Sequence, residues 1–188
     1  MKKSIYLLLC ALLTTACASF EPTHIALNPT LGPVNLHTQL DVPIGVEVVD
    51  TRSKNYVVQF DQAPKQPRLV STSEPIRVQL DSIFRRGMGK AGYVIDPAAP
   101  KRVQFQLEYL LTDVIDNTLN YEAKTRLVIK VKASNSTQEF TKTFSGNGYL
   151  KGPLSPDFAT LELDINKLID KLTTEILNDN ELHQFLEK

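Results

Sequence analysis

The sequence predicts an α+β fold: a two-layer sandwich whose mainly antiparallel sheet carries two long helices on one face, with a short C-terminal helix. Two observations support this prediction. Apolar residues alternate with polar ones along several stretches, as in half-buried strands, and recur every three or four residues in two others, as in amphipathic helices. The patterns follow one another in the order strand, helix, strands, helix, which is typical of this class.

The first expected elements are short strands. Ile44, Val46 and Val48 indicate a buried strand that ends near Asp50. Two further stretches, 56–60 and 68–71, flank a loop that contains Pro64 and Pro67. The sequence therefore predicts three short strands before the first helix.

The first long helix is expected after Ser73, a good N-cap residue. Its apolar stripe comprises Ile76, Leu80, Ile83, Phe84 and Met88. The following residues, 87–92, spell GxGxxG, but a dinucleotide site needs these glycines at the start of a helix, where backbone N–H groups meet phosphate. We therefore interpret them as a helix end, and we expect no cofactor.

Three long strands should come next. Val103, Phe105, Leu107 and Tyr109 alternate with polar residues, and the doubled Leu110-Leu111 suggests a bulge. Turns are expected near 116–117 and 135–136, so the strands should form an antiparallel meander.

Two helices should end the chain. The run Ser155-Pro156-Asp157 is typical of a helix start, and an apolar stripe follows it through Leu161, Ile165, Leu168, Ile169, Leu172 and Ile176. Asp179 can cap a final short helix, in which His183 is expected to be solvated or partly packed.

The N-terminus is typical of a secretory signal. Residues 1–3 are Met-Lys-Lys, and an uncharged apolar stretch from Ile5 to Leu13 follows, too short to span a bilayer. Small residues then lead to Cys17, as at the lipidation site of bacterial lipoproteins, with Thr14 where that pattern usually has leucine. An ordinary cleaved signal with an incidental cysteine is the alternative. We predict a lipoprotein signal peptide over 1–16, with acyl chains such as palmitate on Cys17.

The next segment lacks a period and contains four proline or glycine residues, so we expect residues 17–40 to hold the lipidated cysteine and a flexible tether. Residues 41–188 should form one periplasmic α/β domain. His24 and His37 lie in the tether without a third ligand nearby, so no metal site is expected.

Few residues suggest chemistry. Lys plus Arg equals Asp plus Glu at 21 each, and no basic stripe with interleaved aromatic residues occurs, so nucleic acid is not an expected partner. Asp113 and Asp116 are three apart, which places them on opposite faces of a strand, and serines lack the GxSxG motif. We therefore expect no enzymatic activity.

Two groups of charged residues are candidate binding sites. A local basic cluster can be a solvated helix end or a patch for anionic headgroups or glycan carboxylates, and it comprises Arg85, Arg86, Lys90, Lys101 and Arg102. Asp50 and Arg52, at the end of the first expected strand, can form a structural ion pair or a contact site.

The chain resembles the YajG family of bacterial lipoproteins. The likeness rests on Cys17, on Val48-Val49-Asp50-Thr51-Arg52, on the helix from Leu80 to Met88 leading into Ala91-Gly92-Tyr93-Val94, and on the ending from Leu177 to Leu186. The resemblance implies a small periplasmic α/β domain on an outer-membrane lipid anchor. It implies no catalytic residues.

The expected function is therefore that of a non-enzymatic outer-membrane lipoprotein that binds a periplasmic protein partner in envelope assembly or maintenance, through a strand edge or helix face. The alternative is a binder of peptidoglycan or muropeptides, suggested by the basic cluster. A glycan hydrolase is the third possibility.

Overall fold

The computed structural model describes residues 22–61, 64, 66–117 and 119–188. The expected signal peptide, 1–16, and Cys17 lie outside these residues. The elements in chain order are β1 (His24–Ile25), β2 (Pro43–Asp50), β3 (Tyr56–Asp61), β4 (Arg68–Thr72), α2 (Ile76–Lys90), β5 (Val94–Ile95), β6 (Arg102–Asp116), β7 (Asn120–Ser134), β8 (Glu139–Pro153), α3 (Phe158–Leu177) and α4 (Asn180–Glu187).

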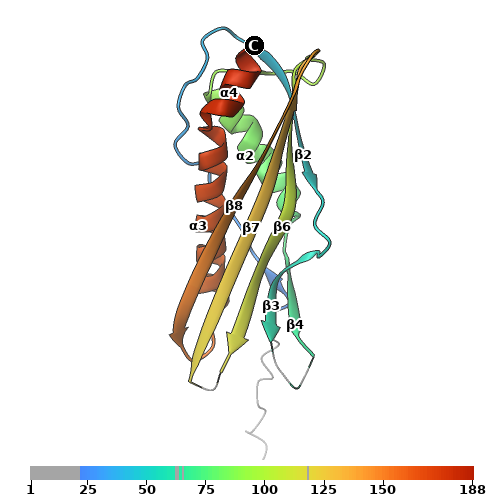
Figure 1. Ribbon diagram of the computed structural model, residues 1–188. Coiled ribbons are helices and arrows are strands. Elements are labelled where there is room, and N and C mark those ends of the chain that lie inside the picture. Colours follow the sequence, from blue (N-terminus) through green and yellow to red (C-terminus); the bar gives the residue numbers. More distant parts are fainter. Residues whose placement is uncertain (1–21, 62–63, 65, 118) are drawn as a thin grey trace, which may run out of the picture.

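Three long strands, β6, β7 and β8, run almost the length of the molecule (Figure 1). β6 pairs antiparallel with β7, and β7 pairs antiparallel with β8 along all fifteen residues of each strand. The predicted meander of long strands is confirmed. Their inward residues are mostly apolar and their outward residues mostly polar, so the alternation in the sequence identifies both strand and face.

The opposite edge of β6 is paired in parallel. β2 lies beside the first half of β6 and β3 beside the second half, and the pairs β1–β4 and β2–β5 are parallel as well. The sheet is therefore mixed, and it curls into a half-barrel (Figure 1). The predicted two-layer sandwich with a mainly antiparallel sheet is wrong. Periodicity identifies strands but not their neighbours, and β2 is separated from β6 by β3, β4, α2 and β5.

The helices follow the curl of the sheet instead of forming a flat layer. α2 packs against β2 and β5, whereas α3 packs against β7 and β8. The Phe84 ring of α2 stacks on the Phe105 ring of β6, with centroids 3.8 Å apart. Gly87 lets α2 approach α3, because a Cβ at this position would lie 2.4 Å from Cδ1 of Leu177.

Local details differ from the sequence predictions. α2 begins at Ile76 with no side-chain cap, and the Ser73 hydroxyl instead donates to the carbonyl of Ile25. The bulge in β6 lies between Leu107 and Tyr109, not at Leu110-Leu111. These shifts arise because tertiary partners compete with local preferences.

Residues 26–35, here called the strap, lie along α3. Ile25 and Leu27 are buried, and strap N–H groups donate to side chains of α3 and of its C-cap residue, Asn178. The pairs are Ala26 to Glu162 (2.8 Å), Asn28 to Asn166 (3.0 Å), Thr30 to Asp170 (2.7 Å) and Asn35 to Asn178 (2.8 Å). In the first three pairs, the donors are two residues apart in the strap and the acceptors are four residues apart in α3. Two residues of extended chain advance about 6.6 Å and four residues of helix about 6 Å, so the spacing of donors matches that of acceptors. The described part of 17–40 is thus docked, unlike the predicted tether.

Candidate functional site

The free side of β8 is an open sheet edge. In the described part of the chain, β8 pairs with β7 and with no other strand. Its outward residues Thr141, Thr143, Ser145 and Asn147 are exposed, and residues 143–150 include no charged side chain. Natural edge strands are usually protected by charges, proline or bulges. This stretch, here called the β8 edge, therefore offers backbone N–H and C=O groups to an added strand.

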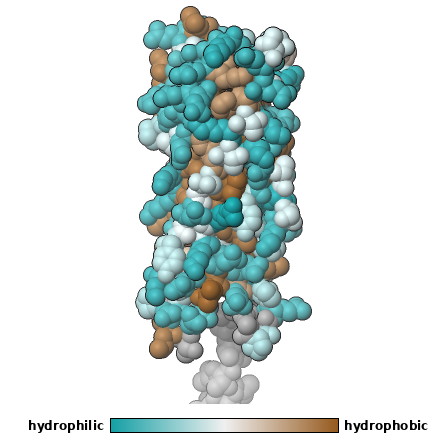
Figure 2. All heavy atoms as spheres, viewed as in Figure 1, coloured by the Kyte–Doolittle hydropathy of each residue, from teal (hydrophilic) through white to brown (hydrophobic). Residues whose placement is uncertain are grey.

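Hydrophilic side chains cover most of the face shown in Figure 2, with hydrophobic atoms in a narrow strip and at both ends. The outward rows of the long strands account for this polarity. Glu47, Gln104, Lys132 and Thr141 occupy neighbouring register positions on β2, β6, β7 and β8. The outer face is therefore suited to polar rather than apolar ligands.

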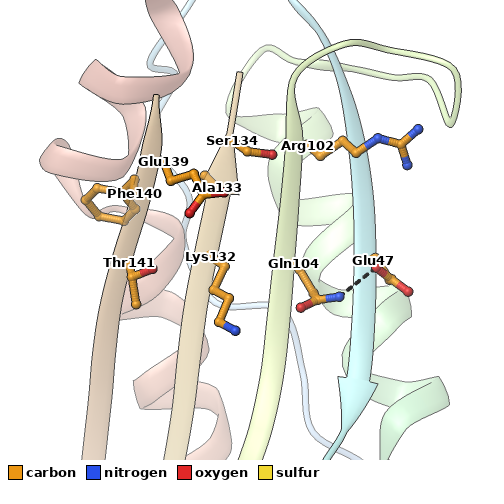
Figure 3. A pocket seen from close by; sticks show the side chains of 9 residues that line it. All are labelled: Glu47, Arg102, Gln104, Lys132, Ala133, Ser134, Glu139, Phe140 and Thr141. Carbon is orange, nitrogen blue, oxygen red and sulfur yellow. Dashed lines mark hydrogen bonds between the residues drawn. The ribbon is translucent and has the colours of Figure 1, made fainter. Parts of the chain in front are cut away.

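A pocket of about 310 Å³ opens on these four strands, near the start of β6 (Figure 3). We call it the sheet pocket. The Gln104 amide nitrogen donates to a Glu47 carboxylate oxygen at 2.8 Å, which fixes both side chains at one side of the pocket. Its lining carries both signs of charge, from Arg102 and Lys132 and from Glu47 and Glu139, and the uncharged polar side chains of Gln104, Ser134 and Thr141.

The structure separates the roles of the predicted basic cluster. Arg85 donates to the Asp81 carboxylate and to the Val46 carbonyl, which ties α2 to β2. Lys101 donates to the carbonyl of Leu186 at 2.7 Å and so holds the end of α4. Arg86 and Lys90 are exposed on α2, and Arg102 lines the sheet pocket. Arg86 also donates to the Ser82 carbonyl of its own helix at 3.1 Å, so three members make intramolecular hydrogen bonds.

Asp50 and Arg52 form a two-point ion pair. Arg52 donates from Nε and Nη2 to the two Asp50 oxygens at 2.9 and 2.7 Å, and its backbone N–H donates to the same carboxylate. Burial opposes ionisation of Asp50, but these hydrogen bonds and the Arg52 charge outweigh it, so the pKa of Asp50 is lowered. The pair joins the end of β2 to the loop before β3.

A buried cluster that sequence reasoning missed surrounds His183, which is 2% exposed rather than solvated. Its Nε2 donates to the Leu177 carbonyl at 2.9 Å, and the ring stacks on His37 with centroids 3.6 Å apart. The Tyr93 hydroxyl lies within hydrogen-bond distance of the other ring nitrogen, Nδ1, at 2.9 Å. The predicted tether histidine, His37, thus packs against the last helix. No local signal in the sequence marks this pairing, because its members come from distant segments.

Two kinds of feature are absent from the described residues. No group of three or more His, Cys, Asp or Glu side chains there could hold a metal ion. None of the helices in this part of the chain is both long and apolar enough to cross a bilayer.

Comparison with known proteins identifies the family. Residues 29–187 match the family model described as "Uncharacterized lipoprotein". The chain belongs to this family. It is 20% identical to the "Uncharacterized lipoprotein YajG" of two Escherichia coli strains over 189 aligned positions, covering 100% of the chain and 97% of each relative. The resemblance to YajG found in the sequence is thereby confirmed, and membership of a lipoprotein family indicates a membrane-associated envelope protein.

The fold also occurs in a solved structure. Protein XCC0632 from Xanthomonas campestris matches with a TM-score of 0.57 at 14% identity, over 88% of this chain and 98% of that one. At this identity the likeness concerns the fold alone. The family and the fold are thus shown, whereas the activity must be argued from the surface.

Proposed function

We propose that the mature protein is lipidated at Cys17, is anchored in the outer membrane facing the periplasm, and acts without catalysis by binding a protein partner whose extended segment adds to the β8 edge. The observation that carries this proposal is the uncharged stretch from Thr143 to Leu150, which pairs with β7 on one side and with no described strand on the other. Main-chain hydrogen bonds would supply affinity, and outward side chains would supply specificity. We place the partner in envelope assembly or maintenance.

Photo-crosslinking in intact envelopes tests the docking surface. A photoreactive residue at Thr143 or Asn147 should trap one discrete protein adduct, and the same residue at the exposed Arg77 of α2 should not. Thr143→Lys should abolish the adduct formed from position 147, because a lysine at a sheet edge opposes strand addition. Ser136→Lys, in the exposed β7–β8 turn, is the matched control and should leave the adduct intact. Equal adducts from Arg77 and Asn147 would refute the proposal.

The sheet pocket supports a second candidate, the binding of peptidoglycan or muropeptides. Its two cations, Arg102 and Lys132, and its carboxylates, Glu47 and Glu139, could bind the carboxylates and amines of a stem peptide. Retention by purified sacculi should fall in the Arg102→Ala/Lys132→Ala variant and persist in Arg86→Ala. Loss in Arg86→Ala alone would favour the exposed part of the basic cluster instead.

A further inference from the structure

We propose that the end of the molecule bearing the β6–β7 turn contacts the same bilayer that holds the N-terminal lipid anchor. This inference rests on the proposed lipidation of Cys17. Three large apolar side chains are exposed there: Ile115 by 45%, Leu119 by 77% and Leu154 by 67%. The Leu154 N–H donates to the Leu119 carbonyl at 3.0 Å, so the two leucines are neighbours. We call these three residues the apolar tip.

Leu154 occupies an unfavourable backbone conformation. Its φ of 57° lies in the left-handed region, which glycine and asparagine adopt far more readily than leucine. Its side chain gains little from packing, because two thirds of it is exposed. Neither backbone preference nor burial within the chain accounts for leucine at this position. A contact outside the chain accounts for it.

The strand registers place the start of the described chain near this end. His24 pairs with Ser71, so Pro22 lies about level with Leu69. Leu69 pairs with Gln59, and Gln59 with Asp113. Pro22 is therefore about level with Asp113, on the part of β6 that leads to the apolar tip. In Figure 1, β3, β6 and β8 all point toward this end, and α4 lies at the other.

Chain length then limits how far the apolar tip can stand from the membrane. Pro22 is five residue steps from Cys17, which is at most about 18 Å of extended chain. Asn117 is four residue steps from Asp113, which span about 13 Å back toward the membrane. With the strands upright on the bilayer, the apolar tip can therefore stand at most about 5 Å above the plane of Cys17. That distance is comparable to the headgroup layer, about 5–7 Å thick on each side of the hydrocarbon core.

The occupant of the apolar tip is thus the phospholipid surface. Leu36, Leu40 and Val94 are also exposed, by 61%, 82% and 45%, but they lie at the start of β2 and beside β5, at the far end of the molecule. The bilayer that holds the lipid anchor cannot reach these three residues when the strands stand upright. They therefore serve as the internal control.

Tryptophan probes test the contact, because the chain contains no tryptophan. The full chain carrying Leu119→Trp or Leu40→Trp is purified from membranes with its native N-terminus and reconstituted into phosphatidylethanolamine–phosphatidylglycerol vesicles. Brominated phospholipid should quench Trp emission from position 119, and the emission maximum should move to shorter wavelengths. Position 40 should show neither change. Leu154→Asn should lower the quenching at position 119 without lowering the melting temperature, since asparagine tolerates the left-handed conformation.

The outcomes separate this inference from the proposed function. Protein that floats with vesicles but shows no quenching at position 119 keeps the anchor and overturns the tip contact. The emission maximum of the Trp at position 119 could instead shift with protein density in the vesicles, without quenching by brominated lipid. That result assigns the apolar tip to contact with a second copy and also overturns the bilayer contact. Protein that fails to float, with an unmodified N-terminus by mass spectrometry, refutes lipidation at Cys17 itself.

Discussion

The Tyr93 hydroxyl donates to Nδ1 of His183 at 2.9 Å in the core of the molecule. The other ring nitrogen of His183, Nε2, faces the Leu177 carbonyl, which can only accept a hydrogen bond. Nε2 therefore carries the hydrogen, and Nδ1 accepts from Tyr93. His183 is therefore neutral in the folded state, with both nitrogens satisfied. This contact joins the start of β5 to α4, and the stacked His37 adds the chain that follows the strap.

This histidine should make stability depend on pH. Burial lowers the pKa of His183, aided by His37 and opposed by the Leu177 carbonyl, Asp179 and Glu187. In the unfolded state this histidine has a pKa of about 6.5, so the unfolded state binds more protons than the folded state as the pH falls. The His183 contribution is present above that pH and is lost below it, down through the lowered folded pKa.

We predict that His183→Gln lowers the free energy of unfolding by about 1–3 kcal/mol at pH 7.5. It should also flatten the decline in stability between pH 7 and 5, as measured by urea denaturation. His24→Gln changes an exposed histidine and should alter neither quantity. An unchanged pH profile in His183→Gln would contradict the assignment.

Two glycines of α2 give a matched pair. A Cβ at Gly87 would lie 2.4 Å from Leu177, whereas a Cβ at Gly89 would meet nothing within 4 Å. Gly87→Ala should therefore destabilise the protein by about 1–3 kcal/mol through overpacking between α2 and α3. Gly89→Ala should stabilise it by about 0.5–1 kcal/mol, because alanine favours a helix. Thermal unfolding measures both, and effects of the same sign would refute the close helix approach.

The strap contacts predict local protection. Asp170 accepts the Thr30 N–H at 2.7 Å and the Thr30 hydroxyl at 2.8 Å. Asp170→Ala should therefore speed amide exchange across residues 26–35 and cost about 0.5–1.5 kcal/mol, a modest value because the contacts are solvent-accessible. Lys167→Ala, on an exposed face of the same helix, should leave the exchange unchanged. Uniformly fast exchange in the unaltered protein would show that the strap is a free tether.

The sequence predicts elements well and neighbours poorly. Alternation along Val103, Phe105 and Leu107 identifies β6 because each inward residue meets the core. The parallel pairing of Val46 with Val103 has no local signal, because hairpin turns mark antiparallel neighbours only. The β8 edge was expected only as some strand edge, because the register decides which strand remains unpaired.

The strap was missed for a related reason. Proline and glycine between residues 22 and 33 predict an irregular chain, and the chain is irregular. What docks it is a row of polar side chains four residues apart on α3, beginning at Glu162 and Asn166. On a helix such a row normally indicates a solvated face. Only the tertiary structure shows that the chain's own N-terminal segment covers it.

The ion pair between Asp50 and Arg52 favours the structural one of the two roles that the sequence left open. The Arg52 side chain is 7% exposed, and that of Asp50 27%. A structural role predicts that Asp50→Asn lowers the free energy of unfolding by about 1–3 kcal/mol, because the largely buried guanidinium loses its charged partner. The stabilisation should be present above pH ~4 and vanish as the pH falls through the lowered pKa of Asp50, so the two proteins should converge in acid. Denaturant titrations at pH 7 and pH 3 measure this, with the exposed Asp113→Asn as control. Equal stability at pH 7 would instead assign the pair to an external contact.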